Sequence, residues 1–174
     1  MRAICIAYKL IVRNVCLVVA KKVSIDAQLC FALYATSRAV TQAYGPLLAP
    51  LGVTYPQYLV LLVLWQDDNL TVGEIGARLF LDSGTLTPLL KRLEAQGLVA
   101  RRRDPKDERS VRVSLAPTGR RLRSKAPGIA HDIACALNVS AAEVSALRGQ
   151  LHKVLHHYHS TPSPITRPTR KKTP

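Results

Sequence analysis

The middle of the chain carries two consecutive helix signals, and their order constrains the fold more than any other feature. Thr71 and Glu74 have the spacing of a capping box, in which a hydroxyl and a carboxylate satisfy the first amides of a helix reciprocally. This helix is expected to reach about Leu79. A second helix is predicted over residues 83–96, and Gly97 supplies the left-handed residue that ends it. Two such helices joined by a few residues form a helix-turn-helix.

A β-hairpin is predicted directly after these helices. Residues 98–103 and 109–115 both alternate between apolar and polar side chains, which indicates half-buried strands, and residues 104–107 connect them through a basic tip. A helix-turn-helix followed by such a hairpin is a winged helix. The expected fold class is therefore mainly α with a small β-hairpin wing (α+β), flanked by N- and C-terminal dimerisation helices.

Further helices are predicted on either side of this motif. Apolar residues recur at helical spacing over 24–44, and the Gly-Pro pair that follows is expected to interrupt that helix. Thr54 is expected to cap a buried helix, Thr118 a long basic one, and Ser140 the last one. The terminal helices have too little intramolecular core to cover their apolar stripes. Pairing across a two-fold axis, as a homodimer, is the expected way to bury them.

The two ends of the chain differ from this central domain, which is expected over residues 24–159. In residues 1–23 the longest apolar runs reach about six residues, far short of the roughly 20 that a membrane helix needs. No membrane span is expected there, and the match to a signal peptide is weak. Residues 160–174 are rich in proline and basic residues, and are expected to be disordered.

The charge of the chain points to a polyanionic partner. Its formal net charge is +14, and between Lys91 and Lys125 twelve Lys or Arg face four acidic residues. The four cysteines (Cys5, Cys16, Cys30 and Cys135) have no zinc-site spacing and are too few for a secreted disulfide scaffold. A reducing cytoplasm is the expected compartment, with no metal and no cofactor.

The second helix and the hairpin supply the candidate contacts to double-stranded DNA. Short hydroxyl side chains suit base edges or phosphates, apolar groups suit a thymine methyl, and cationic groups suit guanine or phosphate. The helix candidates are Ser83, Thr85, Thr87, Pro88, Lys91 and Arg92, and the wing candidates are Arg101, Lys106 and Arg109. Asp107 is placed to hold Arg109 in a fixed pose. Because a dimer sets two recognition helices about one helical turn apart, the expected operator is an inverted repeat.

Two stretches resemble a known family. The stretch LTVGEIGARLFLDSGTLTPLLKRLEAQGLVARRRDPKDERSVRVSLAPTG resembles the MarR family of winged-helix repressors, with Asp107 and Arg109 in the family's D-x-R wing motif. The stretch QLCFALYATSRAVTQAYGPLLAPLGVTYPQYLVLLVLW is similar to its organic hydroperoxide resistance subgroup. The resemblance covers about residues 24–159. The DNA-contacting residues that it implies are Ser83, Gly84, Thr85, Pro88, Arg92, Arg101, Asp107 and Arg109.

The same resemblance implies a redox sensor of the two-cysteine type. It implies that Cys30 is the sensing cysteine and that Tyr44 and Tyr55 hydrogen-bond its sulfur, while Tyr34 matches a further subgroup tyrosine. Cys135 occupies the place of a second, resolving cysteine found in some members. By resemblance, its disulfide to Cys30 crosses between subunits. The implied inducer is an organic hydroperoxide, and its effect is release of the operator.

The chemistry of such a sensor begins at a thiolate, which is the form of cysteine that attacks a peroxide. Hydrogen bonds from neutral tyrosine hydroxyls favour the thiolate without a permanent ion pair. Attack leaves a sulfenic acid at Cys30, and Cys135 then condenses with it to a disulfide. The N-terminal extension departs from the subgroup, and whether its Cys5 and Cys16 compete with Cys135 is left open.

Three other interpretations are weighed against this one. The first is a MarR-type regulator released by a small aromatic ligand, with Cys30 inert. The second is a thiol peroxidase, but Cys30 lacks the P-x-x-x-T-x-x-C context of such an enzyme, so no catalytic activity is expected. The third is a metal site built from His152, His156, His157 and His159, for which a solvated helix face is the expected alternative.

Overall fold

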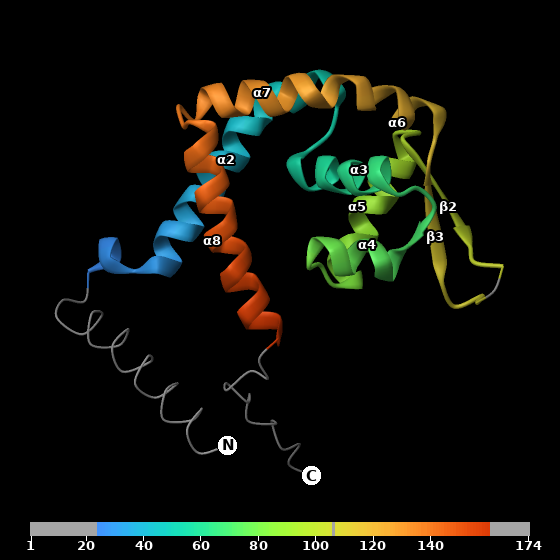
Figure 1. Cartoon of the computed structure of the whole chain (residues 1–174). Helices are drawn as coiled ribbons and strands as arrows, with labels where there is room; N and C mark the ends of the chain where they lie inside the picture. Colours follow the sequence, from blue (N-terminus) through green and yellow to red (C-terminus); the bar gives the residue numbers. More distant parts are fainter. Residues whose placement is uncertain (1–23, 106, 161–174) are drawn as a thin grey trace, which may run out of the picture. The chain divides into compact units, whose positions relative to one another are not determined.

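A computed structural model describes residues 24–105 and 107–160, and Figure 1 shows the order of their elements. The chain forms two compact units, one ending at Ile129 and the other beginning at Ala130. The expected extension (1–23), Lys106 and residues 161–174 of the expected tail lie outside the described residues. Ser160, which was expected in that tail, is instead the last residue of the C-terminal helix. The elements are η1 (Ile25–Ala27), α2 (Leu29–Leu48), η2 (Ala49–Leu51), α3 (Tyr55–Gln66), β1 (Leu70–Thr71), α4 (Val72–Leu79), α5 (Ser83–Ala95), β2 (Val99–Arg103), β3 (Val111–Leu115), α6 (Pro117–Leu122), η3 (Arg123–Lys125), α7 (Ala126–Ala136) and α8 (Ala141–Ser160).

The helix-turn-helix is confirmed as α4 and α5. The Thr71 side chain accepts from the Glu74 amide at 3.2 Å, and the Glu74 carboxylate accepts from the Thr71 amide at 2.7 Å, which completes the predicted capping box. Asp82 caps α5 by accepting from the Thr85 amide at 2.8 Å. Gly97, with φ of +67°, follows the end of α5 as expected.

The wing is confirmed as the antiparallel pair β2 and β3, in which Val99 lies opposite Leu115 and Arg103 opposite Val111. A third strand, β1, pairs with the other side of β3, so the strand order is β1-β3-β2. Strand β1 was not anticipated, because two residues are too short to show alternation. The fold is mainly helical with a small sheet, as the sequence predicts.

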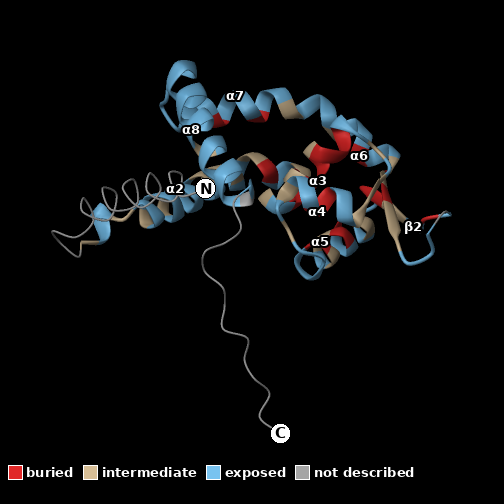
Figure 2. Ribbon diagram, turned by 60° about the horizontal axis from the view of Figure 1, so that its bottom comes forward, coloured by how far each residue is buried: buried red, intermediate tan, exposed pale blue. Residues whose placement is uncertain are grey.

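The core lies beneath this motif and is built mainly by α3, α4, α5 and the sheet. Figure 2 shows the buried residues gathered in this region, while α2 and α8 are largely exposed. On α5 the buried stripe is Leu86, Leu90 and Leu93, each fully buried at the three- and four-residue spacing of a helix face. Trp65 of α3 donates from its indole nitrogen to the Gly119 carbonyl at 3.0 Å, which ties α6 to the core.

The N-terminal helix differs from its prediction at both ends. It begins at Leu29 after the short turn η1, and it runs through Gly45 and Pro46 to Leu48 instead of stopping before them. Proline crowds the side chain of the residue before it, and Gly45 has no side chain to crowd. Because Pro46 lies in the last turn, its missing amide removes only one hydrogen bond near the end of the helix.

The basic helix predicted to be capped by Thr118 is also different. Helix α6 begins at Pro117 with Ala116 as its N-cap, and the fixed φ of proline suits the first helical position. The Thr118 hydroxyl donates instead to the Gly97 carbonyl. The single predicted helix is divided into α6, η3 and α7. The capping box at Ser140 is confirmed, since the Ser140 amide donates to the Glu143 carboxylate at 2.8 Å.

Candidate functional site

Helix α5 has an exposed face opposite its buried leucines. Gly84, Pro88 and Lys91 are exposed and follow one another at four- and three-residue steps, so they lie on one side of the helix. Arg92 is also exposed on α5. At the N-terminal end of this face Gly84 has no side chain, and the Asp82 carboxylate lies close beside it, 3.0 Å from where a Cβ atom would be.

The N-terminus of α5 already holds an anion. The Asp82 carboxylate accepts from both the amide and the hydroxyl of Thr85, at 2.8 and 2.9 Å. The backbone hydrogen bond from Thr85 is the main cause that lowers the pKa of Asp82. The Thr87 hydroxyl donates to the Ser83 carbonyl at 2.7 Å. The Thr85 and Thr87 hydroxyls therefore keep their acceptor lone pairs for a ligand, while their protons are used within the helix.

A cavity of about 330 Å³ lies between the start of α4, the start of α5 and the wing. It brings together three of the predicted contacts, Ser83, Thr87 and Arg109. Ser110 lies beside them, a residue that the sequence interpretation missed because its neighbourhood depends on how the hairpin folds back. The complete lining is Thr71, Val72, Gly73, Ser83, Thr87, Arg109, Ser110 and Val111. The recognition helix and the wing therefore share one concave surface.

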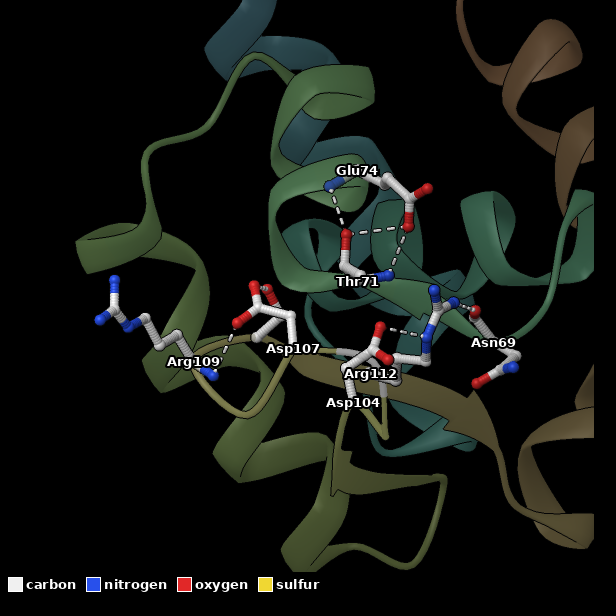
Figure 3. A network of polar contacts seen from close by, with 8 residues as sticks. Asn69, Thr71, Glu74, Asp104, Asp107, Arg109 and Arg112 are labelled. Atoms are coloured by element: carbon white, nitrogen blue, oxygen red, sulfur yellow. Dashed lines mark hydrogen bonds and ion pairs between the residues drawn. The ribbon is translucent and has the colours of Figure 1, made fainter.

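The tip of the wing is held by Asp107. Its carboxylate accepts from the backbone amide of Arg109 at 3.1 Å and from the Ser110 hydroxyl at 2.8 Å. Figure 3 shows the Arg109 side chain extending away from Asp107, and the dashed line between them ends on the backbone nitrogen. Asp107 thus fixes the turn that presents Arg109 and leaves the guanidinium pointing outward. The contact between Asp107 and Arg109 is thus made at the backbone amide, and the positioning of the Arg109 side chain for DNA stays a prediction.

Two arginines at the base of the wing are engaged within the chain. The Arg101 Nε donates to Glu94 of α5 at 2.8 Å, and this hydrogen bond is the main cause that lowers the pKa of Glu94. Arg112 donates to the buried Asp104 at 2.6 Å and to the Asn69 carbonyl at 2.8 Å (Figure 3). Arg101, a predicted DNA contact, therefore has a structural partner that joins β2 to α5.

Cys30 is an exposed, free thiol in the first turn of α2. Tyr34, one turn later, is also exposed, and its hydroxyl accepts from Arg38 at 3.3 Å. Tyr44 lies fourteen residues beyond Cys30 on the same helix, which separates the two by about 21 Å along the axis. Within one chain, Tyr44 does not reach the Cys30 sulfur.

Tyr44 forms an aromatic pair with the predicted Tyr55. Their ring centroids are 4.5 Å apart, and Tyr58 lies 6.0 Å from Tyr44. Burial is the main cause that raises the pKa of Tyr44, Tyr55 and Tyr58 above the usual tyrosine value. The phenols of this cluster are therefore protonated at neutral pH, so each hydroxyl has a proton to donate in a hydrogen bond.

Cys135 is the second exposed free thiol, and it lies in the last turn of α7. Its sulfur is 3.7 Å from the Nε2 atom of His131, one turn earlier on the same helix. Sequence reasoning missed this histidine, although its four-residue spacing from Cys135 is the signal of two side chains on one helix face.

Comparison with known proteins identifies the family to which a chain with this geometry belongs. The MarR family pattern matches residues 53–111. A Bacillus subtilis protein named organic hydroperoxide resistance transcriptional regulator is 48% identical over 135 residues, covering 78% of this chain and 92% of its own. The chain belongs to the MarR family. A second relative, the HTH-type transcriptional regulator TtmR of Methylorubrum extorquens, is 51% identical over 137 residues, which cover 79% of this chain and 70% of TtmR.

Solved structures of AbfR, a protein of Staphylococcus epidermidis, resemble this MarR-family chain as well. Reduced AbfR bound to DNA is 36% identical with a TM-score of 0.65, and the match covers 77% of this chain and 94% of AbfR. Disulfide-formed AbfR is 36% identical with a TM-score of 0.55, over 79% of this chain and 93% of AbfR. Family membership makes the chain a DNA-binding transcriptional regulator, and this removes the thiol peroxidase interpretation.

The histidines of the MarR-family chain do not form a metal-binding group among the described residues. His157 contacts the Lys153 carbonyl at 2.7 Å, and His156 contacts the Ser160 hydroxyl at 3.5 Å. In the described residues, no single helix combines the length and apolar character that a bilayer crossing requires. One pair, Leu29–Leu51 with Tyr55–Gln66, meets both criteria only when joined across a 71° bend.

Proposed function

We propose that two copies of this chain grip an inverted-repeat operator, with α5 in the major groove and the wing against the neighbouring backbone. The observation that carries this proposal is the cavity shared by Ser83, Thr87 and Arg109 beside the exposed face of α5. Arg109 supplies an outward-pointing cation at the rim, and the hydroxyls supply acceptors for base edges. Lys91 and Arg92 of α5 supply two further exposed cations for DNA. Lys106 is proposed as a contact from the sequence alone, because it lies outside the described residues.

A homodimer is supported by apolar side chains that the chain leaves uncovered. On η1 and the first half of α2, Ile25 is 59% exposed, Leu29 66% and Leu33 38%. Helix α8 exposes a second set, made of Val144, Leu147, Val154, Leu155 and Tyr158. Neither set has enough cover within its own unit, and a two-fold related copy of the same helices offers matching apolar faces.

Oxidation of Cys30 by an organic hydroperoxide is the proposed release signal. Its exposed position lets a peroxide reach the sulfur, and neutral tyrosine hydroxyls are the proposed stabilisers of the thiolate. Since Tyr44 lies about 21 Å from Cys30 along one helix, the Tyr44–Tyr55 pair can serve that sulfur only from the second subunit. Tyr34 lies one turn from Cys30 and can contribute from the same chain.

Cys135 is the proposed resolving thiol, which forms a disulfide with Cys30 of the partner subunit. Its support is an exposed free thiol and the resemblance to AbfR, a relative whose structures are described as reduced and DNA-bound, overoxidised and DNA-bound, and disulfide-formed. Two free thiols in the described chain suit a reducing compartment, so we place the regulator in the cytoplasm.

The decisive experiment measures operator affinity by fluorescence anisotropy before and after treatment with cumene hydroperoxide. The reduced full-length chain should prefer an inverted repeat from the DNA upstream of its own gene over a random duplex. Moving the half-sites apart by about 5 base pairs should abolish the preference, because the two recognition helices then face opposite sides of the DNA. Equal affinity for all duplexes would reject the DNA proposal.

The redox half of the proposal is tested on the same operator. Hydroperoxide should release the wild-type chain and leave Cys30→Ser bound, whereas salicylate or another aromatic acid should release neither. Cys135→Ser should still form the Cys30 sulfenic acid but no disulfide between subunits. Release of both wild type and Cys30→Ser by the aromatic acid alone would favour the small-ligand alternative over a thiol sensor.

A further inference from the structure

Cys135 and His131 form a close pair on one face of α7. Both side chains are exposed, and the Cys135 sulfur lies 3.7 Å from His131 Nε2. This is within reach of a sulfur hydrogen bond, in which the nitrogen is the acceptor when the imidazole carries its hydrogen on Nδ1. We propose that His131 is the base that takes the thiol proton when Cys135 attacks the sulfenic acid at Cys30, an inference that rests on the proposed function.

The position of Cys135 explains why a base is needed. Helix α7 ends at Ala136, one residue after the cysteine, and the left-handed Asn138 follows. The last turn of a helix presents carbonyl oxygens and no unpaired amide donors to a side chain. A thiol at this place therefore becomes a better nucleophile if a neighbouring group removes its proton during attack.

The surroundings leave His131 as the group that can do so. A cavity of about 380 Å³ opens beside the pair, and its lining is His131, Ala134, Cys135, Asn138, Val139 and Ser140. Within this lining the histidine and the cysteine are the titratable members. Glu143, at the start of α8, is occupied by Ser140, whose side-chain hydrogen bond is the main cause that lowers the pKa of Glu143. Asp132 is the next residue after His131, so it points to another side of the helix.

The step balances without a further reagent. The hydroperoxide has already oxidised Cys30 to its sulfenic acid and has itself been reduced to an alcohol. The Cys135 sulfur then forms a bond to the Cys30 sulfur while the S–O bond breaks, and the thiol proton passes to His131 Nε2. The oxygen leaves as hydroxide and takes up a proton to become water, and His131 returns its proton to the solvent.

The first test measures the Cys135 thiol alone, so it does not depend on Cys30. In the full-length Cys30→Ser chain, iodoacetamide labelling of the Cys135 peptide is followed by mass spectrometry as a function of pH. At neutral pH His131→Gln should slow labelling about tenfold, less than the roughly 10²- to 10⁴-fold contribution of a well-placed general base. The rates should converge at alkaline pH, where the thiol loses its proton without help. His152→Gln, an exposed histidine on α8, is the matched control and should label like its parent.

The second test measures the disulfide. After one equivalent of cumene hydroperoxide, His131→Gln should accumulate the Cys30 sulfenic acid and form the Cys30–Cys135 disulfide about tenfold more slowly than wild type and His152→Gln. Equal labelling rates and equal disulfide rates in His131→Gln and wild type would overturn the role of His131. If Cys30 is never oxidised, the proposed sensor fails, and the labelling experiment still decides whether His131 activates Cys135.

Discussion

Replacing Gly76 by alanine should weaken the fold at the contact that sets the angle between α4 and α5. A Cβ atom at Gly76 would lie 2.7 Å from the Leu81 carbonyl oxygen and 3.7 Å from the Leu86 side chain. The Leu81 amide already donates to the Gly76 carbonyl at 2.9 Å, so this stretch of backbone cannot shift without losing a hydrogen bond. Alanine must therefore push the start of α5 away from α4.

The magnitude follows from two opposing effects. Alanine in a helix is favoured over glycine by about 0.5–1 kcal/mol, and overpacking of a tight contact costs about 1–3 kcal/mol. The expected net loss is about 1–2 kcal/mol. With a urea dependence of about 1–3 kcal/mol/M, the unfolding midpoint should fall by about 0.3–2 M. Operator affinity should fall as well, because α5 no longer meets the wing at the same angle.

Gly73→Ala is the matched control on the same helix. Its nearest neighbour would be the Thr71 hydroxyl oxygen at 4.0 Å, so the added methyl makes only an ordinary van der Waals contact, and stability should stay level or rise by up to about 0.5 kcal/mol. Urea unfolding is followed by circular dichroism at one protein concentration, since dimerisation makes stability depend on concentration. A Gly76→Ala midpoint equal to that of Gly73→Ala would refute the close-contact argument.

Three further predictions concern charge. Arg109→Ala should reduce the slope of log affinity against log salt concentration by about 0.9 for each DNA phosphate that the arginine neutralises, whereas Arg109→Lys should keep most of the slope. Fluorescence anisotropy at several NaCl concentrations measures both slopes. An unchanged slope in Arg109→Ala would show that Arg109 does not contact the DNA. The side-chain hydrogen bond from Arg101 lowers the pKa of Glu94, so the folded state gains stability above the ordinary glutamate pKa and loses it as the pH falls. In Glu94→Gln the urea midpoint should therefore fall less on acidification than it does in wild type. Equal acid sensitivity of the two proteins would contradict the ion pair. Burial raises the pKa of Tyr44 and Tyr55, so at alkaline pH the folded state holds protons that the unfolded state has lost. The stability of the wild-type protein should therefore fall as the pH rises past about 10, and Tyr44→Phe and Tyr55→Phe should each reduce that fall. A wild-type urea midpoint that does not change with pH in this range would contradict the burial effect.

Local signals in the sequence predicted the parts of the fold that local interactions build. The capping boxes at Thr71 and Ser140 are completed by residues three positions away, and both are present. The hairpin follows from alternation within two short segments. The Gly-Pro pair after Tyr44 led to a wrong prediction of where the helix ends, because a proline in the last turn of α2 does not stop the helix.

The parts that could not be predicted depend on segments far apart in the sequence. Strand β1 exists because Leu70 and Thr71 meet β3, more than forty residues later. Arg101 was expected at the DNA, and its ion pair with Glu94 appears only when β2 folds back onto α5. The separation of Tyr44 from Cys30 is different, because fourteen residues on one predicted helix already imply about 21 Å.

The most direct measurement follows the Cys30 thiol and operator binding on one time course. Cumene hydroperoxide is added to the operator complex in amounts that range from substoichiometric to excess. Anisotropy reports the fraction of protein bound to the operator, and mass spectrometry reports the modified fraction of Cys30. The account predicts that the two fractions change together and that Cys30→Ser stays bound throughout. A wild-type complex that remains on the operator with Cys30 fully oxidised, or a Cys30→Ser complex that dissociates equally fast, would contradict it.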